Sequence, residues 1–268
     1  HFGACLVILA MALELYDQGS AAWAALVYGL GPALTFSARI ISTDVPLLFF
    51  WALALLAYVK LLAKLDWRWA VTFGVACGLG ILAKYAMVYF FLGALCAACF
   101  DRDARALLKR RQIWAAMAIC GLCVLPNVFW NVSNDFATLR HTGDNITGGG
   151  LHLKFVAPLE FIAAQFAVAG PLIFATFLYI LVSAGSRIGR NNGLMMAFAI
   201  PPLAIVLALS FFRNANANWA APAIPSMTIL VVAWWLRNTW KGWIGVALAI
   251  GLAVQAMLLV SDAFADRI

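Results

Sequence analysis

Long runs of apolar residues, separated by short polar stretches, dominate this chain. Ten such runs lie at residues 2–16, 20–37, 45–62, 67–83, 85–100, 112–130, 161–184, 193–212, 220–236 and 242–260. Each run is continuous rather than alternating, which predicts helices instead of the strands of a transmembrane barrel. Most runs approach the about 20 residues that cross the hydrocarbon core of a bilayer. The pattern predicts an all-α, polytopic integral membrane protein with about ten transmembrane segments.

Composition excludes the main alternatives to a membrane protein. Hydrophobic residues make up 65% of the 268 positions and charged residues 11%, whereas a soluble domain carries about 25% charged residues. A soluble enzyme, a nucleic-acid-binding module and a disordered chain are therefore all excluded. We expect a single transmembrane domain over residues 1–268, with an outer loop at 131–160. We expect it to be incomplete at its N-terminus, because the run at 2–16 is shorter than a spanning helix.

The basic residues predict the orientation in the membrane. If successive loops alternate between the two sides, one side collects twelve of the 18 basic residues, in segments 17–19, 60–68, 101–111, 185–192 and 237–241. The positive-inside rule makes this the cytoplasmic side and places the loop at 131–160 outside. Short basic clusters between apolar runs are typical of membrane topology, so no nucleic-acid partner is expected. Only Lys84 separates the fourth and fifth runs, which predicts two short helices with a tight turn, or a re-entrant hairpin.

Two charged residues on the predicted outer side are candidates for chemistry. Asp44 follows Arg39 in a polar turn and precedes Pro46 and an apolar run. It could be a helix cap, or a carboxylate that holds a hydroxyl, a metal or a cation. Lys84 is the only charge between Trp69 and Phe100. It could be a lysine that extends to the interface, or a cation that binds phosphate.

Two polar stretches on the same side are further candidates for a binding site. The first begins at Asn127, Trp130 and Asn131 and continues to Arg140 and His141. The second holds the amides of Asn216 and Asn218 beside Trp219. The alternatives are an aromatic belt with a flexible loop in the first case and a hydrogen-bonded turn in the second.

The cysteines have a zinc-like spacing that we do not interpret as a metal site. Cys96 and Cys99 form one pair, and Cys120 and Cys123 form another. The two pairs are predicted to lie at different depths, so they would not meet around one ion. We expect small apolar core residues here and assign no metal ligand.

Four stretches of the sequence resemble glycosyltransferase family 39. They are Arg39 to Trp51, Gly78 to Tyr85, Leu125 to Asn131 with Arg140 and His141, and Asn216 to Ala223. They occur in order over about 200 residues. The resemblance implies the type C glycosyltransferase fold, as in protein mannosyltransferases and bacterial lipid A aminoarabinose transferases. It also implies a sugar donor linked to polyprenyl phosphate and used on the outer side of the membrane.

The resemblance also implies roles for individual residues. Asp44 is similar to the family's second outer acidic position and would support catalysis, while the family's main acidic motif is absent from these residues. Three cations would hold the lipid phosphate, namely Lys84, Arg140 and Arg39. The residues expected to line the substrate site are Tyr85, Asn127, Trp130, Asn131, His141, Asn216, Asn218 and Trp219. His141 adjoins a region where some members bind a metal, which leaves room for a divalent ion as cofactor.

The sequence thus favours a bacterial, multi-pass enzyme of the inner (cell) membrane with a site that faces the periplasm. It would transfer a sugar from a polyprenyl-phosphate carrier to a glycan, lipid or protein acceptor. The alternative is a non-catalytic structural subunit of a larger membrane complex with the same fold. A transporter is the weaker third hypothesis, because no internal symmetry and no charge in mid-helix are visible.

Overall fold

A computed structural model describes residues 1–138, 140, 143, 153–183, 188–212 and 214–265 of the chain. Every regular element within these ranges is a helix. The elements are α1 (Phe2–Leu15), α2 (Gln18–Gly29), α3 (Pro32–Ser37), α4 (Asp44–Ala63), α5 (Trp67–Ala83), η1 (Tyr85–Val88), α6 (Tyr89–Phe100), α7 (Arg102–Leu107), α8 (Arg111–Ser133), α10 (Val156–Val168), α11 (Pro171–Ser183), α12 (Arg190–Ser210), η3 (Ala217–Ala220), α13 (Ala223–Arg237) and α14 (Gly242–Ala265).

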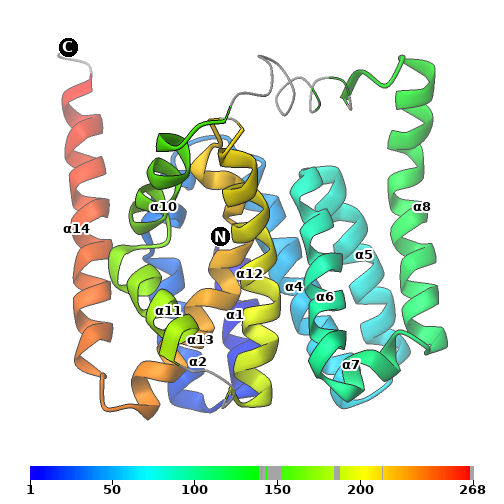
Figure 1. The fold of residues 1–268 in the computed structure, drawn as a ribbon, viewed down its shortest axis with the longest axis horizontal. Helices are drawn as coiled ribbons and strands as arrows, with labels where there is room; N and C mark the ends of the chain where they lie inside the picture. Colours follow the sequence, from blue (N-terminus) through cyan, green and yellow to red (C-terminus); the bar gives the residue numbers. More distant parts are fainter. Residues whose placement is uncertain (139, 141–142, 144–152, 184–187, 213, 266–268) are drawn as a thin grey trace.

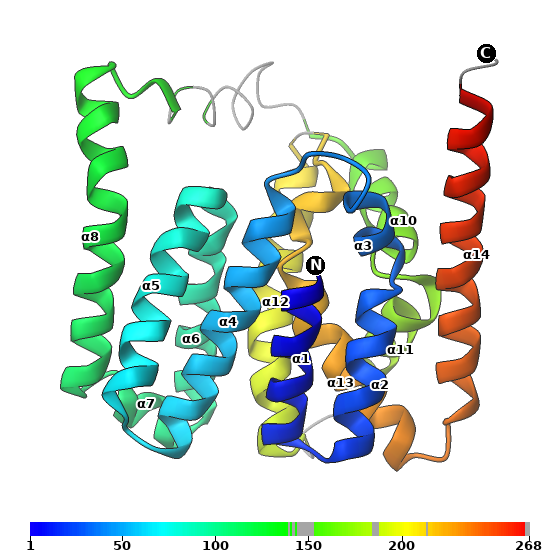
Figure 2. The same cartoon turned by 180° about the vertical axis from the view of Figure 1, so that it is seen from behind.

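The helices run up and down in one bundle (Figures 1 and 2). Helices α4, α12 and α13 lie in its middle, whereas α8 and α14 stand at opposite edges. The two edge helices are apolar and mostly exposed, with only 17% and 11% of their most apolar windows buried. Apolar helices with an exposed apolar surface are suited to contact with lipid rather than water. The architecture confirms an all-helical membrane protein.

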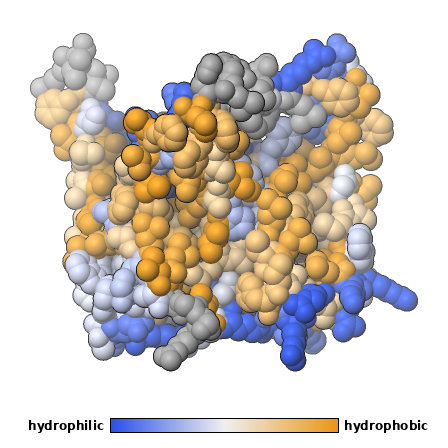
Figure 3. Space-filling view, in the orientation of Figure 1, coloured by the Kyte–Doolittle hydropathy of each residue, from blue (hydrophilic) through white to orange (hydrophobic). Residues whose placement is uncertain are grey.

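The two ends of the bundle differ in charge. We call the end that carries residues 38–44, 84–88 and 214–220 the site end, and the opposite end, with residues 60–68, 101–111 and 237–241, the basic end. Figure 3 shows hydrophilic residues along the lower edge, where α7 lies, and hydrophobic residues over the sides. Arg190 at the basic end donates to Asp101 and Asp103. Burial raises the pKa of Asp101, but the hydrogen bonds from Arg190 and the Ala104 N–H outweigh it, so the pKa lies below its usual value.

The expected ten or so spans are not confirmed, although the all-helical architecture is. Among the described residues, four helices are long and apolar enough to cross a membrane: α4, α8, α12 and α14 up to Phe264. A bent pair, α10 and α11, gives a fifth candidate. The apolar helices α1, α5 and α13 and the η1–α6 segment are shorter, at 10–17 residues. The turn at Lys84 does join two antiparallel helices, as the charge pattern predicted.

Two segments that the apolar pattern predicted as single helices are broken. The run at 161–184 divides into α10 and α11, which meet at an angle of 119°. The break lies at Gly170, whose φ of +94° suits glycine, and at Pro171, which cannot continue the ladder of α10. The run at 20–37 divides in the same way, because Pro32 starts α3 after Gly31. Both breaks lie at a Gly–Pro dipeptide.

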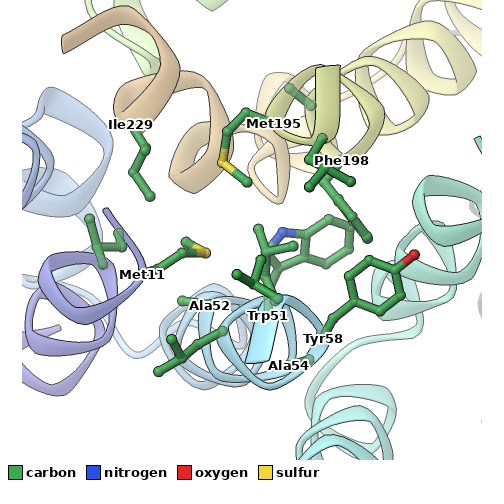
Figure 4. Packing of buried hydrophobic residues seen from close by; sticks show 14 of the residues in the cluster. Met11, Trp51, Ala52, Ala54, Tyr58, Met195, Phe198 and Ile229 are labelled. Carbon is green, nitrogen blue, oxygen red and sulfur yellow. The ribbon is translucent and has the colours of Figure 1, made fainter. Parts of the chain in front are cut away.

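An aromatic core holds the central helices together (Figure 4). Trp51 of α4 meets Phe90 of α6 edge-on, with ring centroids 5.2 Å apart. Phe198 of α12 lies 4.7 Å from Phe90 and 5.3 Å from Tyr58. All four side chains are buried, so one cluster joins α4, α6 and α12.

Glycines allow close contact between α5 and α8. A Cβ atom at Gly74 would lie 2.5 Å from the Ala116 carbonyl oxygen, and one at Gly78 would lie 2.5 Å from the Cys123 Cβ. The spacing of four residues places both glycines on one face of α5. This is the small-residue packing typical of transmembrane helices. Helix α5 continues past both glycines to Ala83.

Candidate functional site

The candidate site begins with Asp44, the first residue of α4. Thr43 occupies the cap position, so Asp44 is the first helical residue rather than the cap. The Ser42 hydroxyl accepts the Asp44 backbone N–H at 3.1 Å, and Pro46 needs no acceptor in this first turn. The Asp44 side chain is buried, with the residue 6% exposed. Its negative charge is favoured by the positive end of the α4 dipole.

Lys84 neutralises this carboxylate. Its Nζ donates to Asp44 Oδ1 at 2.6 Å, although the two residues are 40 positions apart. The extended backbone of Lys84 ends α5 before η1 begins, which turns the chain back toward the basic end. An ammonium has three donors, and only one points at Asp44. No residue in the described part of the chain accepts from the other two, which remain for a ligand.

Asn218 completes the environment of Asp44. Its Nδ2 donates to Asp44 Oδ2 at 2.8 Å, and the Ser42 hydroxyl donates to the same oxygen at 3.2 Å. Both carboxylate oxygens are thus occupied by partners from three separate segments. These contacts hold the Asp44 carboxylate and the Lys84 ammonium in fixed positions.

Gln165 supports η3 from below, and sequence reasoning missed it. Gln165 lies in α10 and is 2% exposed. Its Nε2 donates to the Ala217 carbonyl at 3.1 Å, directly before Asn218 in the chain. A small apolar cluster of Phe161, Val206 and Ala220 lies beside it, with Trp219 packed against the cluster. Helix α10 therefore holds η3 in place through this hydrogen bond and this apolar packing.

A second hydrogen-bonded network extends from Tyr85 to the end of α8. The Tyr85 hydroxyl lies 2.9 Å from the Thr138 hydroxyl oxygen and donates to Asn127 Oδ1 at 3.4 Å. Asn131 is buried at 3% exposure and donates to the Asn127 carbonyl at 2.9 Å. Asn131 Oδ1 accepts both the backbone N–H and the hydroxyl of Thr138. The network fixes the segment after α8 against the turn at Lys84.

A cavity of about 870 Å³ lies between these two networks. Its polar side is formed by Lys84, Tyr85, Asn127 and Thr138. Its apolar side is formed by Ile81, Leu82, Ala83, Ala86 and Leu209, with Tyr89 and Trp219. The volume lies within the range of small-molecule sites, about 300–1,000 Å³. A cavity whose described lining combines the Lys84 cation with an extended apolar wall is suited to an amphiphile with an anionic group.

Several predicted site residues lie elsewhere. Arg39 pairs with Asp262 of α14 and lines a separate cavity of about 430 Å³. The structure therefore does not bring Arg39 to Lys84. Trp130 and Asn216 are exposed and do not line the 870 Å³ cavity. Arg140 is exposed two residues after Thr138, and its role stays a prediction.

The remaining predictions concern a metal site and the outer loop. His141 lies outside the described residues, as does most of the middle of the loop at 131–160. Helix α8 continues to Ser133 and α10 starts at Val156, so both ends of that predicted loop are helical. No group of three or more His, Cys, Asp or Glu side chains suited to a metal occurs in the part of the chain that the structure describes. Cys123 contacts the α5 face at Gly78.

Comparisons with known proteins point to one class of enzyme. Residues 3–130 match the family model described as dolichyl-phosphate-mannose-protein mannosyltransferase. The chain is 32% identical over 224 residues to the lipid A galacturonosyltransferase RgtD of Rhizobium johnstonii. The aligned region covers 83% of this chain and 47% of RgtD. It is 25% identical over 160 residues to the lipopolysaccharide core galacturonosyltransferase RgtB of the same organism. That aligned region covers 56% of this chain and 32% of RgtB.

The chain spans about half the length of RgtD and about a third of RgtB. No solved structure matches the chain significantly. The matched residues 3–130 include Lys84, Tyr85 and Asn127, which line the 870 Å³ cavity, and Asp44, which pairs with Lys84.

Proposed function

The chain is related to the glycosyltransferases of family 39, and on this premise we propose that it forms the membrane part of an enzyme that transfers a sugar from a polyprenyl-phosphate carrier. The observation that carries the proposal is the 870 Å³ cavity with Lys84 at its polar side. A polyprenyl-phosphate sugar has an anionic group, an apolar tail and a polar sugar. The cavity offers a cation, an aliphatic wall and hydroxyl and amide groups for these three parts.

Lys84 has the central role in the proposed reaction. The bond between the sugar and the carrier phosphate breaks, so negative charge develops on the phosphate as it leaves. A fixed cation stabilises that charge where water is scarce. Asp44 holds the Lys84 ammonium at 2.6 Å, and Asn218 holds Asp44. The ammonium is therefore oriented before the substrate binds, which avoids reorganisation during the reaction.

The acceptor side of the reaction needs a separate base. A hydroxyl that attacks the sugar must lose a proton to a carboxylate within hydrogen-bond reach. Asp44 already pairs with Lys84 and accepts from Asn218 and Ser42, and we assign the base to the family's first acidic motif, which these residues do not include. The relatives named above act on lipid A and on the lipopolysaccharide core. We propose a lipopolysaccharide-type glycolipid as the acceptor class and the periplasmic side of the inner membrane as the place of transfer.

A transfer assay with the full-length protein tests the proposal. The protein is reconstituted in vesicles with a radiolabelled polyprenyl-phosphate sugar and lipid A. Lys84→Met should lower transfer by about a hundredfold, the size typical of removing one group that stabilises a developing anion. Lys64→Met is the matched control, since Lys64 is an exposed lysine at the basic end. Equal activity of Lys84→Met and wild type would contradict the proposal.

A further inference from the structure

A second polar cavity lies at the basic end, at the opposite end of the bundle from Lys84. It has a volume of about 300 Å³ and lies where α11 ends, α12 begins and α13 ends. Its lining residues are Ile180, Ser183, Ile188, Asn192, Trp234, Arg237 and Asn238. Nothing in the proposed transfer reaction uses this cavity.

Among the described residues that line this cavity, Arg237 is the charged one. Its guanidinium carbon lies 4.9 Å from the centroid of the Tyr16 ring, so a cation–π contact fixes its position. The ion pairs within the described part of the chain use Arg39, Lys60, Lys84 and Arg190, and none uses Arg237. The N–H donors of Arg237 are therefore not taken up by a carboxylate.

The carboxylate of Asp17 lies close enough for the charge of Arg237 to affect its pKa. The pKa of Asp17 is lowered, first by the backbone N–H of Ser20 and more weakly by the charge of Arg237. The Asp17 carboxylate also accepts the Ser20 hydroxyl at 2.9 Å and caps α2. Asp17 thus has its own partners and does not pair directly with Arg237.

Asn192 supplies a second donor to the same cavity. The Tyr16 hydroxyl donates to Asn192 Oδ1 at 2.9 Å, which orients the amide and leaves its Nδ2 side for another acceptor. The neighbouring Asn191 donates to the Leu15 carbonyl, so the start of α12 is held against the end of α1. Tyr16 therefore positions both the guanidinium of Arg237 and the amide of Asn192.

Trp234 lines the cavity, and two further aromatic rings, Tyr179 and Trp240, pack against it. Trp234 and Trp240 meet edge-on at 4.7 Å, and Tyr179 stacks on Trp240 at 5.6 Å. Tryptophan and tyrosine are enriched at the level of lipid headgroups, and basic residues gather on the same side of a membrane protein. This combination of tryptophan, tyrosine and arginine is typical of the level of lipid headgroups.

We propose that this cavity binds the phosphate of an anionic phospholipid from the leaflet at the basic end. Arg237 and Asn192 donate to the phosphate oxygens, and the indole of Trp234 with Ile180 and Ile188 contacts the start of the acyl chains. Basic pockets between transmembrane helices recognise such headgroups through the same chemistry. A guanidinium is well suited to the task because its planar N–H groups match two phosphate oxygens at once.

Lipid binding to the full-length protein in zwitterionic detergent tests the proposal. Phosphatidylglycerol is titrated and bound lipid is counted by native mass spectrometry, with phosphatidylcholine and inorganic phosphate as parallel probes. Arg237→Gln should weaken phosphatidylglycerol binding at least tenfold. The control Arg68→Gln removes an exposed arginine from the same end and should bind as the wild type does.

A second variant tests the cavity itself without changing any charge. Ser183→Trp fills the cavity from an exposed position and leaves every charge in place; it should also weaken phosphatidylglycerol binding at least tenfold. Unchanged binding by either Arg237→Gln or Ser183→Trp would overturn the proposal. An equal loss of binding in Arg68→Gln would also overturn it, because it would indicate unspecific electrostatic attraction. Inorganic phosphate that binds as tightly as the lipid would overturn it as well, because it would indicate a site for free anions.

Discussion

The Lys84 ammonium and the Asp44 carboxylate, 40 positions apart, meet at 2.6 Å at the site end of the bundle. The pair joins the turn after α5 to the first turn of α4, and Asn218 adds a third segment through its bond to Asp44. Asp44 is a buried carboxylate with a cation on one oxygen and an amide on the other. Removal of either partner would leave part of a buried charge unpaired, which destabilises the folded protein. The arrangement explains why these residue types occur in a chain with so few charges.

Coupling between the two charges is the first prediction. Asp44→Asn leaves Lys84 without a counter-ion, and Lys84→Met leaves Asp44 charged and buried, so each single change should destabilise the protein. The double variant removes both charges and should recover part of the loss. We expect a coupling energy of about 1–3 kcal/mol from the cycle. It is measured by denaturant unfolding in detergent, and strictly additive effects would contradict the ion pair.

A second carboxylate beside Asp44 should be strongly unfavourable. Asn218→Asp places an anion where Asn218 Nδ2 now donates to Asp44 Oδ2 at 2.8 Å. Like charges at that distance repel, so Lys84 is drawn to two anions and is less available to a phosphate. We expect sugar transfer to fall at least tenfold, which corresponds to about 1.4 kcal/mol. Asn216→Asp changes an exposed neighbour by the same charge and should retain most of the activity.

Gln165 should act through η3 without contact to the substrate. Gln165→Met keeps the length of the side chain but loses the donor to the Ala217 carbonyl. An unpaired buried carbonyl costs about 1–3 kcal/mol. We expect a lower thermal midpoint and a fall in kcat that exceeds the change in KM, because η3 positions Asn218. Gln112→Met, at the start of α8, is the control, and an equal effect of both variants would remove the special role of Gln165.

Helix packing gives a prediction that is independent of function. Gly78→Val adds atoms where a Cβ would already lie 2.5 Å from Cys123 Cβ, so α5 and α8 must separate. We expect a loss of about 1–3 kcal/mol in unfolding free energy. Gly121→Ala is a matched change on α8, since a Cβ there has no neighbour within 4 Å. It should be neutral or stabilising because alanine favours the helix; a loss equal to that of Gly78→Val would contradict the contact.

Part of this site could be predicted from the sequence, because a charge is conspicuous among apolar residues. The sequence predicts both Asp44 and Lys84 as site residues, but their pairing depends on how α4 and α5 lie side by side. The predicted topology gives the side of the membrane on which a residue lies, but it does not give the residue's position around the helix bundle. For this reason Arg39 was grouped with Lys84, although it faces Asp262 across another cavity.

Other features were missed for different physical reasons. Gln165 is one amide in an apolar helix, and its partner is a backbone carbonyl, which no residue pattern reveals. The breaks at Gly31–Pro32 and Gly170–Pro171 did have a signal, since Gly–Pro dipeptides mark turns. The apolar runs around them obscured it, because hydropathy does not register helix breakers.

The most direct test of the central claim is to locate the lipid carrier on the protein. A polyprenyl phosphate with a photoreactive group near its phosphate is cross-linked to the full-length protein in vesicles, and the labelled peptides are identified by mass spectrometry. The account predicts labels in residues 81–89 and near Trp219, around the 870 Å³ cavity, and their loss in Lys84→Met but not in Lys64→Met. Labels confined to the cavity of Arg39 and Asp262, or unchanged by Lys84→Met, would contradict it.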